Sequence, residues 1–301
     1  MNRGWSYREQ VPAEGAGRTV LAHLVATYRH STASDWAARI DGGEVVVDDA
    51  VAPPDAILRA GQWLTWHRPA WQEADVPQHF EVIHEDDAIV AVNKPSGLPT
   101  MPAGGFLDHT LLTLVRAQYP AASPLHRLGR FTSGIVLFAR TRAAASALSR
   151  SWREHDVKKH YRALATGIAE ADTFTIDAAI GPVPHPVLGD VYAASAIGKP
   201  SRSVATVIER RRDATLFEVE ITTGRPHQIR IHLAYAGHPL VGDPMYDAGG
   251  VIKQQPGLPG DGGYLLHAER LSFAHPVTSA MLDLIAAPPP ALRNARVQEK
   301  N

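Results

Sequence analysis

A polar loop that runs directly into a short apolar strand constrains this chain more than any other stretch of its sequence. The loop is HRLGRFTSG, residues 126–134, and the apolar run IVLFA, residues 135–139, follows at once. Side chains that carry function often lie on loops that a rigid strand holds in place. Thr-Ser-Gly is typical of the turn between two such parts. We therefore expect a buried strand with a functional loop in front of it.

Helices and strands alternate along the rest of the chain without a regular period. We expect helices after Thr19 and over 33–40, 111–118, 142–155 and 226–236, and strands over 44–47, 88–93, 135–139, 159–165 and 215–223, with a further turn and strand within 58–66. Such irregular mixing favours an α+β fold over a doubly wound parallel sheet.

Three parts follow from the distribution of these elements. Residues 1–15 are expected to be a loose tail, residues 16–75 a small module, and residues 76–301 a larger catalytic domain. In the small module two short helices precede the patterns I-x-x-G-x-V-x-V and L-x-x-G-x-x-L, which together resemble the S4-like RNA-binding fold. Residues 17–68 carry five Arg against six acidic side chains. This charge favours a degenerate S4-like module, kept partly for packing or positioning. The Pro- and Trp-rich segment 66–77 is expected to be a linker.

The overall charge does not indicate a general nucleic-acid coat, because the formal net charge is −1. The distribution is uneven: residues 126–162 contain nine Lys or Arg and two acidic side chains. A local basic face is what a phosphate-binding groove needs, although a solvated helix face would account for the charge equally well.

Composition excludes several other classes of protein. The chain has no Cys, so it has no disulfide, no thiolate zinc site and no Cys nucleophile. No apolar run approaches the ~18–20 residues that cross a bilayer, and the N-terminus lacks the apolar region of a signal peptide. We expect a cytoplasmic protein.

Motifs for metal and nucleotide chemistry are also missing. The closely spaced His pairs 155/160 and 227/232 are five residues apart, so they do not share a helix face. No H-E-x-x-H, no phosphate-binding loop and no G-x-G-x-x-G after a strand occurs. Ser96 and Ser133 lie beside glycine but outside G-x-S-x-G, which leaves a serine hydrolase as a weak alternative. We expect no metal and no cofactor.

Arginines in loops and at a helix start form the densest group of candidate functional residues. Arg127, Arg130, Arg225 and Arg230 lie beside Thr, Ser, Gly or His. Arginine makes bidentate contacts with phosphate and stacks on bases. Tyr161 lies in the basic run and suits base stacking, although for a single Tyr in a strand a core or cross-strand role is the better interpretation.

These residues belong to motifs that resemble the RluA-type RNA pseudouridine synthases. The matching segments are KPSG (94–97), HRLxxxTSG (126–134), KxYxA (159–163), TGRPHQIRIH (223–232), GHPLVGD (237–243) and LHA (266–268). The resemblance covers about residues 82–275 and keeps the order of the motifs.

The resemblance implies isomerisation of uridine to pseudouridine within RNA, ribosomal or transfer, without cofactor or metal. It implies a largely antiparallel central sheet with flanking helices and a target nucleotide that is flipped out. Arg127 would replace that nucleotide in the RNA helix, Tyr161 would stack on the uracil, and Arg230 would pair with the catalytic carboxylate. Further RNA contacts are expected from Lys94, His126, Arg130, Thr132, Arg225 and His227.

One position departs from the family pattern. The essential aspartate of the family directly follows Leu128, and here that residue is Gly129. Loss of a catalytic nucleophile typically costs on the order of 10⁴–10⁶ in rate. Three explanations are open: another carboxylate (Asp108, Asp243 or Glu269) reaches the site, the chain is an inactive relative that binds RNA, or the glycine is an engineered or erroneous substitution.

Overall fold

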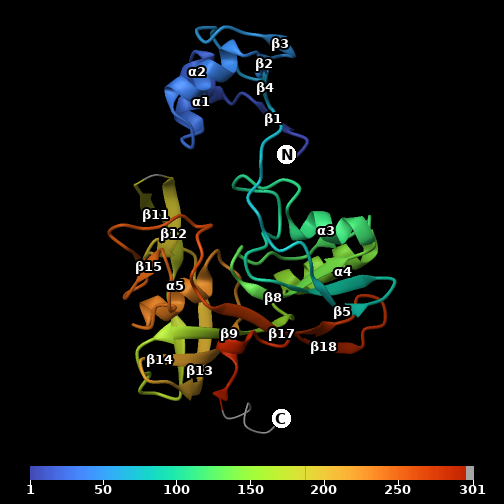
Figure 1. The fold of residues 1–301 in the computed structure, drawn as a ribbon, viewed down its shortest axis with the longest axis vertical. Coiled ribbons are helices and arrows are strands. Elements are labelled where there is room, and N and C mark those ends of the chain that lie inside the picture. The colour runs from blue at the N-terminus through green and yellow to red at the C-terminus, as the bar shows by residue number, and fades with distance from the viewer. Residues whose placement is uncertain (187, 296–301) are drawn as a thin grey trace. The chain divides into compact units, whose positions relative to one another are not determined.

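The computed structural model describes residues 1–186 and 188–295. The chain forms two compact units, Met1–Glu73 with Pro184–Asp190, and Ala74–Val183 with Val191–Asn301 (Figure 1). The division after Glu73 lies close to the predicted boundary after residue 75. In the described part of the chain, no helix has the length and apolar character needed to span a membrane.

The smaller unit is a four-stranded sheet with two helices. Its elements are β1 (Trp5–Gln10), η1 (Ala13–Gly15), α1 (Val20–Thr27), α2 (Ala33–Asp41), β2 (Val45–Val47), β3 (Ala50–Val51) and β4 (Trp63–Arg68). Thr19 and Thr32 cap the two helices through their side-chain oxygens, as expected of threonine before an apolar helical stretch. Trp36 and Leu24 are buried in the core between helices and sheet. The S4-like identity of this unit stays a prediction.

The prediction of a loose tail over residues 1–15 is wrong. Residues 5–10 form β1, which pairs antiparallel with β4 over its whole length. The ring of Tyr7 stacks on Trp66 with a centroid separation of 5.3 Å. The predicted linker also starts too early, because β4 continues to Arg68 and that guanidinium lies 3.5 Å from the ring centroid of Trp71. Partners about sixty residues apart therefore order the N-terminus.

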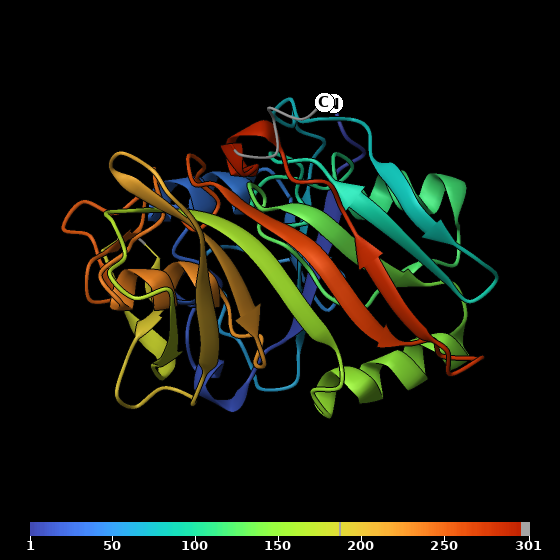
Figure 2. The same cartoon turned by 90° about the horizontal axis from the view of Figure 1, so that it is seen from below.

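A ten-stranded sheet dominates the described residues of the larger unit (Figure 2). The strand order is β10-β13-β14-β9-β17-β8-β6-β5, with β18 beside β17 and β7 beside β8; every pair is antiparallel except β17 with β8. The strands are β5 (Glu81–Glu85), β6 (Ile89–Lys94), β7 (Ser123–Pro124), β8 (Ser133–Ala139), β9 (Lys158–Thr166), β10 (Thr173–Asp177), β13 (Arg202–Arg210), β14 (Ala214–Ile221), β17 (Leu266–Ala274) and β18 (Met281–Ile285).

Helices cover both faces of this sheet. They are α3 (Leu111–Gln118), α4 (Arg142–Arg153) and α5 (Gln228–Tyr235). On β6, Val90 and Val92 belong to the buried cluster that contains α3 and α5, whereas Ile89 and Ala91 belong to the cluster of α4. Burial on both faces explains the continuous apolar runs of β6 and β8. The predicted α+β class with a largely antiparallel sheet is confirmed.

Helix α5 lies between the sheet and two small hairpins. The hairpins are β11 (Ile180–His185) with β12 (Gly189–Ala194) and β15 (Tyr246–Asp247) with β16 (Val251–Ile252); the short helix η2 (Pro290–Leu292) follows β18. All residues from Gln228 to Ala234 are buried. The predicted start at Pro226 is two residues early, because His227, directly before the helix, takes a left-handed conformation with φ 56°.

Gly134 makes the parallel contact between β8 and β17 possible. Its φ is +109°, and a Cβ at this position would lie 2.2 Å from the carbonyl oxygen of Ala268. Only glycine adopts this conformation at so close an approach of two backbones. The turn at the end of the functional loop is therefore fixed by the sheet itself.

We expect Gly134→Ala to destabilise the larger unit by at least ~3 kcal/mol, because the methyl group combines a strained φ with a backbone clash. Urea unfolding followed by tryptophan fluorescence measures this change. Gly224→Ala is the matched control, since a Cβ there meets nothing within 4 Å, and its effect should stay within ~0.5 kcal/mol. Equal effects of the two substitutions would contradict the role of Gly134.

Candidate active site

A buried lysine, Lys94, binds backbone carbonyls of the loop 126–134 and of the segment 95–98. The Lys94 ammonium donates hydrogen bonds to the carbonyl oxygens of Pro95, Leu98 and Arg130 at 2.9, 2.7 and 3.0 Å. Its burial lowers the pKa of Lys94 to about 7. The side chain thus lies inside the protein and connects two loops, and an RNA contact of Lys94 stays a prediction.

Two further interactions fix the backbone on either side of position 129. Thr100 Oγ1 donates to the carbonyl of Leu128 at 2.9 Å and accepts the Leu128 N–H at 3.2 Å. Arg130 Nε donates to the carbonyl of Gly97 at 3.0 Å, and its guanidinium lies 4.6 Å from the ring centroid of Phe106. The residue between Leu128 and Arg130 thus has a defined place.

His126 connects the start of the loop to β8. Its Nε2 accepts the backbone N–H of Leu137 at 3.1 Å, and its ring stacks on Trp152 at 5.2 Å. Burial, with a smaller effect of the Lys159 charge, lowers the pKa of His126 to about 4. The ring is therefore neutral and makes structural contacts to β8 and Trp152, and an RNA contact of His126 stays a prediction.

The strongest electrostatic feature of the site is the ion pair of Arg230 and Asp243. Arg230 Nε and Nη2 donate to the two carboxylate oxygens at 2.7 and 2.8 Å, and both side chains are about 2% exposed or less. Burial raises the pKa of Asp243, but the hydrogen bonds and charge of Arg230 outweigh it and hold that pKa below its ordinary value. Asp243 thus provides the ion-pair partner that the resemblance assigns to a carboxylate.

The guanidinium of Arg230 is enclosed by aromatic rings. Its Cζ lies 4.2 Å from the ring centroid of Tyr264 and 5.0 Å from that of Tyr246. Within the described residues, the third nitrogen, Nη1, is buried and has no hydrogen-bond partner. An unpaired buried donor is costly, so this nitrogen is suited to an acceptor that a bound molecule supplies.

Gly129 lies beside the hydroxyl of Tyr264. A Cβ at position 129 would lie 2.9 Å from Tyr264 Oη and 3.4 Å from Thr132 Oγ1. Gly129 itself is exposed, whereas Tyr264 and Thr132 are buried. Thr132 Oγ1 is 3.4 Å from Tyr264 Oη, so its hydroxyl faces the tyrosine. An RNA contact of Thr132 stays a prediction.

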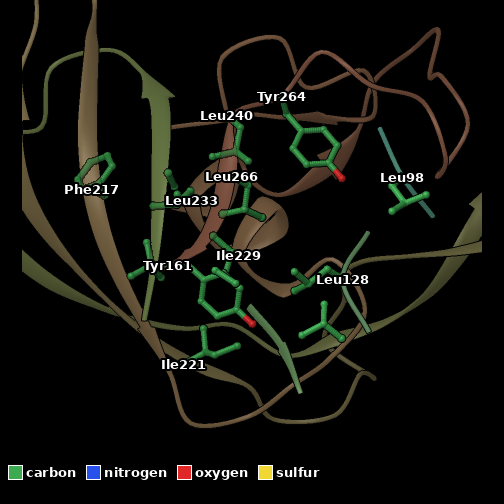
Figure 3. Close-up of a cluster of buried hydrophobic side chains, with 14 of the residues drawn as sticks. Leu98, Leu128, Tyr161, Phe217, Ile221, Ile229, Leu233, Leu240, Tyr264 and Leu266 are labelled. Carbon is green, nitrogen blue, oxygen red and sulfur yellow. The ribbon is translucent and has the colours of Figure 1, made fainter. Parts of the chain in front are cut away.

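Tyr161 lies on β9 in the buried cluster that also contains Tyr264 and Leu128 (Figure 3). The hydroxyls of both tyrosines point to the side of the cluster on which Leu128 lies. Burial raises the pKa of Tyr161 to about 12, so its hydroxyl stays protonated at neutral pH. Stacking of this ring on a uracil stays a prediction.

His227 has a defined tautomer. Tyr246 Oη donates its proton to the carbonyl of Tyr192 at 2.8 Å, so it must accept a proton from His227 Nδ1 at 2.7 Å. Burial first, and the charge of Arg230 second, lower the pKa of His227 to about 4. The ring is therefore neutral, and its Nε2 is left as an acceptor.

Two of the remaining predicted RNA contacts are arginines near the start of α5. Arg127 is exposed, and its charge contributes to the lowered pKa of His227, which places it near the start of α5. Arg225 is half-buried, and in the described structure its Nε has no hydrogen-bond partner. Contacts of Arg127, Arg130, Arg225 and His227 with RNA stay predictions.

The three candidate substitute carboxylates have different positions. Asp243 accepts hydrogen bonds from Arg230, Met245 and Tyr246 and is buried. Glu269 accepts from Arg162 Nε at 2.7 Å. Asp108 is half-buried and precedes Thr110, the cap of α3, by two residues. Only Asp243 is shown to lie against Arg230, and its oxygens are already hydrogen-bonded.

Comparisons with known proteins agree with the sequence motifs. The RNA pseudouridylate synthase family matches residues 88–235. The chain is 44% identical over 274 residues to an uncharacterized RNA pseudouridine synthase of Synechocystis, covering 90% of this chain and 94% of that one. It is 36% identical over 354 residues to RNA pseudouridine synthase 5 of Arabidopsis thaliana (99% and 96% covered). It is also 36% identical over 284 residues to ribosomal large subunit pseudouridine synthase D of Neisseria meningitidis (88% and 74% covered).

Among solved structures, human RNA pseudouridylate synthase domain containing 1 matches with a TM-score of 0.58 and 25% identity, covering 74% of this chain and 89% of that one. The chain belongs to the RNA pseudouridine synthase family, and the predicted resemblance is confirmed. In the part of the chain that the structure describes, no group of three or more His, Asp or Glu side chains is placed to hold a metal ion.

Sequence reasoning missed the two tyrosines that flank Arg230. Tyr264 lies two residues before the Leu266-His267-Ala268 motif, and Tyr246 lies three residues after Asp243. Their closeness to matched motifs was the available signal. Which aromatic ring faces the Arg230 guanidinium depends on the fold, and the spacing of these residues along the sequence does not predict it.

We expect Asp243→Asn to cost ~3–5 kcal/mol of stability, because it leaves the buried Arg230 charge without its counter-ion. Asp283→Asn is the control: Asp283 also pairs with an arginine, Arg270, but both side chains are more than 40% exposed, and surface pairs contribute little. Urea unfolding of the two variants compares the pairs. Similar midpoints for both would contradict the importance of the buried pair.

We expect stability to fall as the pH drops from 6.5 toward 4, partly because of His126. The unfolded chain binds a proton on this ring near pH 6.5, whereas the folded protein does so only near pH 4. His126→Gln keeps an acceptor for Leu137 but does not titrate, so its loss of stability between pH 7 and 5 should be smaller by up to ~2 kcal/mol. An equal loss of stability for wild type and His126→Gln between pH 7 and 5 would contradict this prediction.

Proposed function

We propose that this chain isomerises uridine to pseudouridine in RNA, with the flipped nucleotide held between residues 126–134, Tyr161 and Arg230. The observation that carries the proposal is the buried Arg230 guanidinium with a donor that no described protein group satisfies. A uracil carbonyl or a ribose oxygen would supply the missing acceptor. Family membership and the preserved order of the motifs support the same reaction.

The arginines around the site suit a phosphate backbone. Arg127 is exposed at the start of the loop, where it can fill the gap that a flipped nucleotide leaves in an RNA helix. Arg225 precedes α5 and has an unpaired Nε among the described residues, so it is suited to a phosphate oxygen. Neutral His227 offers an acceptor for a ribose hydroxyl or a base N–H.

The substrate class is RNA, and ribosomal RNA is the first substrate that we infer. The Neisseria relative is named for the large ribosomal subunit. Transfer RNA is the comparison substrate. A cytoplasmic location accords with either RNA and stays a proposal.

The test is to incubate the protein with ribosomal RNA and transfer RNA that lack pseudouridine and to map the modified positions. We expect pseudouridine at a small number of defined uridines. Arg127→Ala should lower the single-turnover efficiency at least about tenfold, and raised salt should weaken RNA binding, since phosphate contacts release counterions. Arg212→Ala, an exposed arginine in the turn between β13 and β14, should leave the rate unchanged.

Two outcomes would contradict this proposal. Tight, salt-sensitive RNA binding without pseudouridine on any RNA would contradict the proposed reaction. The protein would then be a binding relative of the enzymes. Binding that does not respond to salt would contradict the assignment of the arginines to phosphate.

A further inference from the structure

The space beside Gly129 is occupied by the end of a tyrosine side chain. Tyr264 Oη lies 2.9 Å from the place of a Cβ at position 129. Because Gly129 is exposed and has no side chain, nothing from residue 129 itself covers this hydroxyl. The hydroxyl of Tyr264 therefore lies directly next to the place that the Cβ of a larger residue at position 129 would take.

The surroundings of Tyr264 differ from those of a tyrosine that only packs in a hydrophobic core. The ring is 5% exposed and packs in the cluster of Leu128 and Tyr161. Among the described residues, its hydroxyl has only a long contact of 3.4 Å, with Thr132 Oγ1. The Arg230 guanidinium lies over the ring, with Cζ 4.2 Å from the centroid. This cation–π contact holds the ring in place beside Gly129.

We propose that Tyr264 is a catalytic residue that replaces the missing carboxylate and moves the proton that isomerisation requires. The inference rests on the proposed function. It also accounts for the coupling of two features: the glycine at 129 makes room for the hydroxyl, and the hydroxyl provides a polar group where the glycine has none.

The proton balance of the reaction needs only one such group. As the N1–C1′ bond breaks, its electron pair moves to N1, which takes the proton of Tyr264, and C1′ becomes an oxocarbenium ion. The uracil turns, and the electron pair of its C5=C6 bond forms the C5–C1′ bond. The phenolate then removes the proton from C5 and the C5=C6 bond is restored. Tyr264 is neutral again, and N1 carries the proton that C5 has lost.

The neighbouring carboxylate does not compete for this role. Asp243 is 2% exposed, and its two oxygens already accept hydrogen bonds from Arg230, Met245 and Tyr246. Movement of Asp243 toward a substrate would break the buried ion pair. Its function is to hold Arg230 in place, whereas Tyr264 lies under the exposed glycine.

The first test replaces Tyr264 by Phe, which removes the hydroxyl and keeps the ring over Arg230. We expect the single-turnover rate of pseudouridine formation to fall at least ~100-fold, while RNA affinity and melting temperature stay close to those of wild type. Tyr119→Phe is the matched control, since this tyrosine also lies beside an arginine, Arg140, at 5.1 Å, outside the site; its rate should not change. A purely structural role of Tyr264 would instead lower the melting temperature or the affinity.

The second test fills position 129. Gly129→Ala and Gly129→Asp both place a Cβ 2.9 Å from Tyr264 Oη, so both should displace the hydroxyl and lower the rate. A faster reaction with Gly129→Asp than with wild type, or an unchanged rate with Tyr264→Phe, would overturn the role of Tyr264 and leave the proposed function standing. A wild-type protein that makes no pseudouridine on any RNA would overturn both proposals.

Discussion

The buried ion pair of Arg230 and Asp243 is the interaction on which the site depends. Two charges in the interior are stable only when each is fully paired, because desolvation costs several kcal/mol per ion. Here the pairing connects α5 to the chain segment just before β15, with backbone N–H groups of that segment completing the shell of Asp243. The guanidinium is therefore held in one orientation, and the rings of Tyr264 and Tyr246 pack against its faces.

Much of the larger fold could be predicted because it follows local patterns. The apolar runs of β6 and β8 and the amphipathic α3 and α4 carry their own signals, and the structure has them within about a turn of the predicted bounds. β1 could not be found in this way. Its residues Trp5 to Gln10 are largely exposed, and the strand exists because β4, far along the chain, offers a pairing edge and Trp66 a ring to stack on. Non-local pairing of this kind leaves little trace in a six-residue stretch.

The site was predictable in its members but less so in their roles. Arg230 and Tyr161 lie in one buried region, as the motifs indicate. Lys94 and His126, however, turn inward, because loop carbonyls and the N–H of Leu137 need buried partners. From the sequence alone, a basic residue that binds phosphate cannot be distinguished from one that binds the protein's own backbone. The difference lies in which side of the loop faces the sheet, and only the tertiary structure decides that.

Position 129 shows why a missing residue has to be interpreted together with its neighbours. In the sequence, Gly129 replaces the aspartate of the family, and the missing carboxylate indicates a loss of catalytic activity. In the structure, the hydroxyl of Tyr264 lies next to this position, so close that a Cβ at residue 129 would collide with it. Arg230 is paired with Asp243, and the ring of Tyr264 packs against its guanidinium. The cation therefore keeps its place without a carboxylate at position 129, because Asp243 supplies the buried counter-ion.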